Sequence, residues 1–148
     1  MKPPDLRSEI ELEKIAIGKA LIDIERACTE IAAPGISPTI IVGAASYIAQ
    51  CYGGIEAILK RIVKNKEYIL PSGGDWHVEL LKMFKKETGN KIGFLDEKLF
   101  SELSLMRKFR HVVIHGYGFT LDRELITLAL NDTPSVVRKF ISALDSYI

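Results

Sequence analysis

The 148-residue sequence has little of what marks disulfide-rich, metal-binding or strongly basic proteins. Its two cysteines, Cys28 and Cys51, are too few for a disulfide framework and too scattered for a zinc site. We interpret both as reduced thiols that fill a core. Twenty Lys and Arg residues stand against nineteen Asp and Glu residues, so the net charge is only +1. Any contact with nucleic acid must therefore depend on a local basic patch.

Long hydrophobic runs are also missing. The longest apolar stretch, 40–49, is too short to cross a bilayer, and the first residues lack the apolar core of a signal peptide. We therefore expect a cytoplasmic protein without membrane spans. What is present is a hydrophobic content of 47%, which is enough for a core, and a length that fits one domain over residues 1–148.

Apolar residues recur at helical spacing through most of the chain. The first predicted helix ends before 33–38 and begins either at Asp5 or with a capping box at Ser8. A second helix is expected over 39–66, where Gly53 and Gly54 allow a close helix crossing or a slight bend. The short link and the length of both helices predict an antiparallel hairpin.

Three further helical segments follow, and no convincing strand is seen. A short helix is predicted over 76–87 with Asp75 as its N-cap, and another from Asp96 to about His115. The pair Thr133–Pro134 predicts the start of a last helix, preceded by a short helix over 122–130. The expected fold is all-α, an antiparallel bundle of four to five helices.

The segment 105–117 carries most of the polar chemistry, including two of the three histidines. Arg110 falls on an apolar stripe, so it either pairs with a buried carboxylate such as Glu56 or opens onto a cleft or interface. His111 and His115 share one helical face but lack a third metal ligand nearby. We therefore expect no metal site. An alternative without any catalytic role is a solvated basic helix end, which the helix dipole favours.

Arg110 and His115 point in different directions on a regular helix, about 140° apart. They converge on one atom only if the helix unwinds near residues 115–116, or if a two-fold dimer brings in a second copy.

The residues Arg110 to Tyr117 fit the pattern R-x4-H-x-Y with a polar residue directly after the arginine. Together with Tyr52…Glu56…Leu59 and the Trp-His-x-x-Leu-Leu segment at 76–81, this pattern resembles the HEPN superfamily, in particular the HepT-like ribonuclease toxins. The resemblance extends from about Leu21 to the C-terminus. His111 departs from the family pattern, in which asparagine is common, but keeps the polar character.

This resemblance implies a homodimeric ribonuclease that cleaves RNA by transesterification, without metal or cofactor. His115 takes the proton from the ribose 2′-OH, and Arg110 stabilises charge on the phosphate. His111 orients the phosphate or serves as the second acid–base group. Tyr117 is the residue that a partner minimal nucleotidyltransferase, the antitoxin, adenylylates. Arg107 and Lys108 supply further phosphate contacts.

Several alternatives stay open from the sequence. The first alternative to a ribonuclease is a non-catalytic HEPN protein that presents a nucleotide or other substrate to a nucleotidyltransferase. The second is a plain helical interaction domain. The alternative to adenylylation for Tyr117 is a packing role just past a helix end. Trp76 and His77 form a hydrophobic plug or a base-stacking platform, and we favour the plug. We interpret the lysines at 82–86 as a solvated face and Glu56 as structural.

Overall fold

The computed structural model describes residues 5–35, 37–86, 92–115 and 122–148, and these residues form five helices. Among them there is no strand, only an isolated bridge between Lys85 and Leu95. The predicted all-α class is confirmed. No helix of the described part is both long enough and apolar enough to cross a membrane. The helices are α1 (Leu6–Ile31), α2 (Pro38–Asn65), α3 (Trp76–Met83), α4 (Glu97–His115) and α5 (Arg123–Tyr147).

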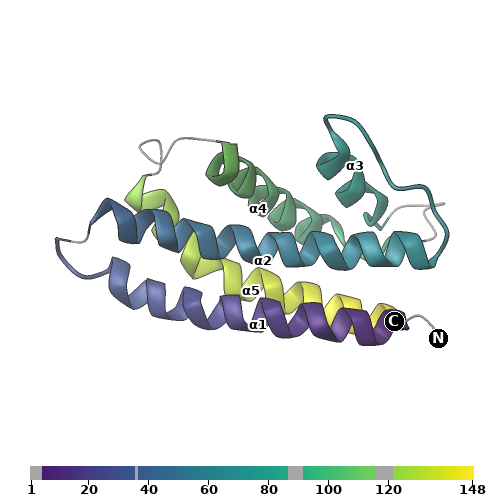
Figure 1. Ribbon diagram of the computed structural model, residues 1–148, viewed down its shortest axis with the longest axis horizontal. Helices are drawn as coiled ribbons and strands as arrows, with labels where there is room; N and C mark the ends of the chain where they lie inside the picture. The colour runs from purple at the N-terminus through teal and green to yellow at the C-terminus, as the bar shows by residue number, and fades with distance from the viewer. Residues whose placement is uncertain (1–4, 36, 87–91, 116–121) are drawn as a thin grey trace.

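Helix α2 lies at the centre of the bundle and contacts the other four helices. Figure 1 shows α1 and α5 along one side of α2, and α3 and α4 along the other. Helices α1 and α2 form the predicted antiparallel hairpin, and the start of α1 lies at the same end of the bundle as the end of α5 (Figure 1). This arrangement gives α2 one face toward α1 and another toward α3 and α4.

Side chains cap four of the helices at their N-termini, namely α1, α2, α4 and α5. Ser8 donates its backbone N–H to the Asp5 carboxylate at 2.7 Å, so α1 begins at Asp5 and not with a capping box at Ser8. Asp96 accepts from the Leu99 N–H at 2.8 Å, as predicted for α4. Asp75 is the N-cap residue of α3, as predicted, but its side chain forms no cap hydrogen bond there.

The two adjacent glycines in the middle of α2, Gly53 and Gly54, face different helices. A Cβ on Gly54 would lie 2.6 Å from Cγ1 of Ile17, so the missing side chain lets α1 and α2 approach closely. A Cβ on Gly53 would lie 3.7 Å from Nε of Arg110, at ordinary contact distance. Helix α2 runs unbroken through both glycines, and the close crossing predicted from the sequence is confirmed at Gly54.

The third helix is shorter than predicted and ends at Met83. The backbone then turns to pair with the segment before α4, since the Phe84 carbonyl accepts from Phe94 and Leu95 N–H at 3.0 and 2.9 Å. Phe84 is fully buried. Burial of its ring and these tertiary hydrogen bonds outweigh the helical propensity of the following residues.

The predicted break at Thr133–Pro134 is wrong, because α5 is a single helix with Pro134 inside it. Proline removes one backbone donor and costs about 3 kcal/mol in a helix interior. One buried stripe nevertheless continues across it, from Ile126 and Leu130 to Val137 and Phe140. The packing of this stripe against the core offsets the proline.

Both cysteines are free thiols. Cys51 is fully buried, and burial raises the pKa of its thiol to about 12. The pKa of the half-buried Cys28 thiol is also raised, mainly by burial. Thiols held in this protonated state are poor nucleophiles, which agrees with their interpretation as core-filling residues.

Candidate functional site

A cleft of about 620 Å³ lies between the beginning of α3 and the end of α4. It brings together all five predicted site residues that the structure describes, namely Arg107, Lys108, Arg110, His111 and His115. Tyr117 lies outside the described residues. The rest of the wall consists of Gly74, Asp75, Trp76, His77, Val78, Val112 and Ile114.

Arg110 combines the two interpretations that the sequence left open. Its Nη1 lies 3.5 Å from Oε1 of Glu56, a carboxylate whose side chain is only 5% exposed. The arginine side chain is itself 27% exposed and lines the cleft. Arg110 is therefore paired with a buried carboxylate while it remains accessible to a ligand.

His77 is held by the other oxygen of the same carboxylate. Its Nδ1 lies 2.6 Å from Oε2 of Glu56, and its side chain is 31% exposed. The Trp76 ring packs against the imidazole with ring centroids 3.5 Å apart, and Lys60 Nζ lies 4.0 Å from the centre of the Trp76 ring. The plug interpretation holds for Trp76, which packs against the core, but His77 is a polar residue of the cleft.

The role of Glu56 as a shared partner was not predicted. The sequence did contain a signal, because Glu56 lies among buried apolar residues of α2 such as Ile55 and Leu59. A carboxylate in such a stripe needs charged or hydrogen-bonding partners from another helix. The sequence suggested Arg110 as one partner, but nothing in the spacing identified His77, which is 21 residues away.

His111 and His115 lie on one face of α4, as their spacing predicted. Their ring centroids are 4.6 Å apart and both side chains are exposed. Helix α4 is regular to His115, and Arg110 and His115 nevertheless border the same cleft within one chain. Within the described ranges, no group of three or more His, Cys, Asp or Glu side chains is placed to hold a metal ion.

Tyr52 lies fully buried on α2, close to Glu56 and the arginines of α4. Its hydroxyl has no hydrogen-bond partner among the described residues. Burial raises the pKa of this phenol well above its ordinary value, and the charge of Glu56 raises it further. Arg107 and Arg110 act in the opposite direction.

The charges of the cleft favour an anion. Arg107, Lys108 and Arg110 line it, against the single carboxylate of Asp75. Arginine and lysine side chains that converge on one cavity are suited to bind phosphate groups. This is the local basic patch that a chain with almost no net charge requires for contact with nucleic acid.

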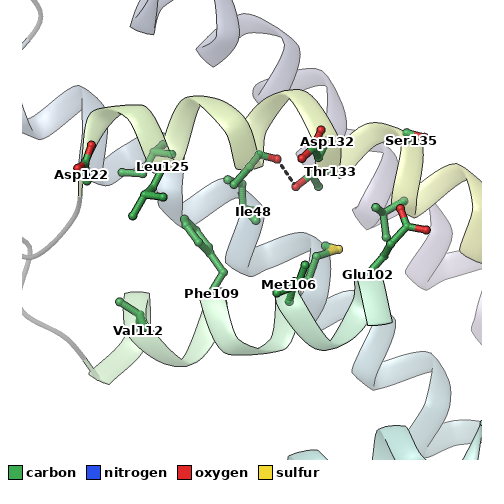
Figure 2. Close-up of a pocket in the computed structure, with 14 residues that line it drawn as sticks. Ile48, Glu102, Met106, Phe109, Val112, Asp122, Leu125, Asp132, Thr133 and Ser135 are labelled. Atoms are coloured by element: carbon green, nitrogen blue, oxygen red, sulfur yellow. Dashed lines mark hydrogen bonds between the residues drawn. The ribbon is translucent and has the colours of Figure 1, made fainter. Parts of the chain in front are cut away.

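An apolar groove of about 590 Å³ runs between α4 and α5. Figure 2 shows Met106, Phe109 and Val112 of α4 facing Leu125 and other residues of α5 across it. Val112 and Leu125 are 45% and 62% exposed, which is unusual for large apolar side chains. Val112 lines both this groove and the cleft that holds Arg110, so the two cavities are neighbours.

The comparison with known families matches this region of the chain. A family model described as HepT-like protein covers residues 43–148, which include every residue of the cleft. No curated protein and no solved structure gives a significant match. The resemblance drawn from the sequence is therefore confirmed at the level of the family. The chain belongs to the family of HepT-like proteins.

Proposed function

We propose that this HepT-like protein is a toxin that cleaves RNA internally by transesterification, in the cytoplasm and without a metal ion or cofactor. The observation that carries the proposal is the cleft that Arg110 and His115 line together with Arg107 and Lys108. It offers a proton acceptor and several cations on one wall. We also propose that residues 1–148 act as one domain, supported by the close packing of α1 on α2.

The proposed reaction needs two proton transfers and one charge stabilisation. His115 accepts the proton of a ribose 2′-OH, and the 2′-oxygen attacks the adjacent phosphorus. Arg110 binds the non-bridging oxygens, where negative charge increases in the transition state. The P–O5′ bond then breaks, which leaves a 2′,3′-cyclic phosphate and a 5′-hydroxyl. His111 orients the phosphate, while Arg107 and Lys108 bind neighbouring phosphates.

We propose that the protein works as a homodimer with the active site at the interface. The apolar groove between α4 and α5 supports this, because exposed Leu105, Val112 and Leu125 line it. A second copy seated there would lie beside the catalytic cleft, which shares Val112 with the groove. A charged residue in place of Leu125 should shift the mass measured by light scattering from dimer to monomer.

We further propose that a minimal nucleotidyltransferase is the antitoxin and adenylylates Tyr117. Tyr117 follows His115, a residue of the cleft, by two positions in the sequence. The phosphate of AMP carries negative charge and would compete with RNA for Arg110. Intact mass of the toxin co-expressed with such a partner should rise by one AMP, and a Tyr117→Phe variant should show no increase.

The function is tested by RNA cleavage with purified protein in EDTA. We expect wild type to cleave, His115→Ala to lose about 10²- to 10⁴-fold in rate, and Arg110→Ala about 10²- to 10³-fold. Arg138→Ala is the control, because this exposed arginine of α5 lies outside the cleft. Circular dichroism should show that all variants fold.

Two results would contradict the proposal. Undiminished cleavage by both cleft variants would place the activity elsewhere. No cleavage by a folded dimer that carries no AMP on Tyr117 would favour a non-catalytic binding protein instead.

A further inference from the structure

We infer that His77 is the general acid of the proposed reaction and gives its proton to the departing 5′-oxygen. This inference depends on the proposed ribonuclease function, which did not assign the second proton transfer to any residue. It starts from the observation that one buried carboxylate, Glu56, contacts both His77 and Arg110.

The hydrogen bond to Glu56 fixes which nitrogen of His77 faces the ligand. An ionised carboxylate only accepts hydrogen bonds, so we infer that Nδ1 of His77 bears the hydrogen and donates a hydrogen bond to Oε2 at 2.6 Å. The other ring nitrogen, Nε2, is left to exchange a proton with a ligand in the cleft that His77 lines. A carboxylate in this position holds the imidazole in one orientation, as the orienting carboxylate of a catalytic triad does.

The imidazole has little freedom to turn away from the cleft. The Trp76 ring lies against it, and Lys60 lies over the Trp76 ring and ties the start of α3 to α2. Glu56 holds the ring through its contact with Nδ1. Because the same carboxylate also contacts Arg110, it positions both the proton donor and the phosphate-binding cation.

His111 is less suited to the same task. Its side chain is exposed, and the ring contact that it makes is with another histidine, His115. His77 instead stands next to a carboxylate on a different helix.

His115 removes the 2′-OH proton, the 2′-O–P bond forms, and the P–O5′ bond breaks as Nε2–H of His77 protonates the 5′-oxygen. The reaction leaves His115 protonated and His77 neutral, and exchange with water restores both. Glu56 touches no reacting atom and is a positioning residue.

A substrate with a sulfur in place of the bridging 5′-oxygen tests this assignment. A thiolate, whose conjugate acid has a pKa of about 8.5, leaves without being protonated. We expect His77→Ala and His77→Gln to slow cleavage of ordinary RNA by about 10²- to 10⁴-fold in EDTA. On the sulfur substrate both variants should come within about tenfold of wild type, and the glutamine variant keeps a donor toward Glu56 if alanine disturbs folding.

The controls separate a chemical role from a structural one. Arg110→Ala and His115→Ala should stay slow on both substrates, because their tasks do not involve the leaving group. Glu79→Ala, an exposed change on α3 outside the cleft, should match wild type on both.

Each other outcome has a definite meaning. If the His77 variants are equally slow on both substrates, or fully active on ordinary RNA, His77 is not the acid although the ribonuclease function stands. If sulfur rescues His111→Ala instead, His111 is the acid. If wild type cleaves neither substrate, the ribonuclease function fails and the role of His77 fails with it.

Discussion

Neighbouring residues of α2 build two very different helix contacts. Toward α1, the missing side chain of Gly54 lets Ile17 pack at a distance that no other residue would permit. Toward α3 and α4, Glu56 is buried yet charged and contacts His77 and Arg110. The first contact is apolar and closes the core. The second keeps a carboxylate where a hydrophobic residue would pack without a desolvation cost, which is typical of residues retained for binding or catalysis.

The largest effect is expected from Glu56→Ala, which breaks the polar contact. The change leaves Arg110 and His77 without their shared partner, and since both are partly exposed we expect a loss of about 1–3 kcal/mol in the free energy of unfolding. RNA cleavage should fall on the order of 100-fold, because both groups lose their positions. Urea denaturation and cleavage rates measure the two effects.

Glu79→Ala is the matched control for that experiment, because Glu79 is exposed and pairs only loosely with Lys82, at 3.8 Å. Its stability should stay within about 0.5 kcal/mol of wild type. A Glu56→Ala protein with wild-type cleavage would show that the buried carboxylate is merely structural.

The next effect separates the two adjacent glycines. Gly54→Ala should destabilise the protein by about 1–3 kcal/mol, because its Cβ would overlap Ile17. Gly53→Ala should instead stabilise it by about 0.5–1 kcal/mol, because the new methyl group meets Arg110 at 3.7 Å and alanine favours helix. Thermal unfolding of both variants gives the two signs; equal effects would mean that α1 and α2 do not cross closely at Gly54.

The smallest effect is expected from Tyr52→Phe, which removes a buried hydroxyl without a described partner. The free energy of unfolding should change by less than about 1 kcal/mol, and in the stabilising direction. A loss above about 1 kcal/mol would show that the hydroxyl is hydrogen-bonded in solution, for example to a buried water.

Much of the fold was predictable because helical periodicity and caps are local signals. The hairpin of α1 and α2, the cap at Asp96 and the close crossing at the glycines all follow from residues near one another in sequence. The errors arose where tertiary packing overrides a local signal. Pro134 marks a helix start in isolation but lies inside α5, and α3 ends early because Phe84 pairs with a distant segment.

The candidate site was predictable along one helix, and across helices only for the contact of Arg110 with Glu56. The spacing of His111 and His115 and the position of Arg110 on an apolar stripe indicated where polar chemistry lies, and all three residues line the cleft. His77 was assigned to a plug because the spacing within α3 says nothing about a carboxylate on α2. Contacts between distant segments such as Glu56 and His77 require the fold itself.

The most direct measurement is the chemistry of the RNA ends that wild-type protein leaves in EDTA. We expect 2′,3′-cyclic phosphate and 5′-hydroxyl ends, because His115 and Arg110 activate the ribose 2′-OH and stabilise the phosphate without a metal. Ends with a 5′-phosphate, formed only when a divalent metal is added, would contradict transesterification in this cleft.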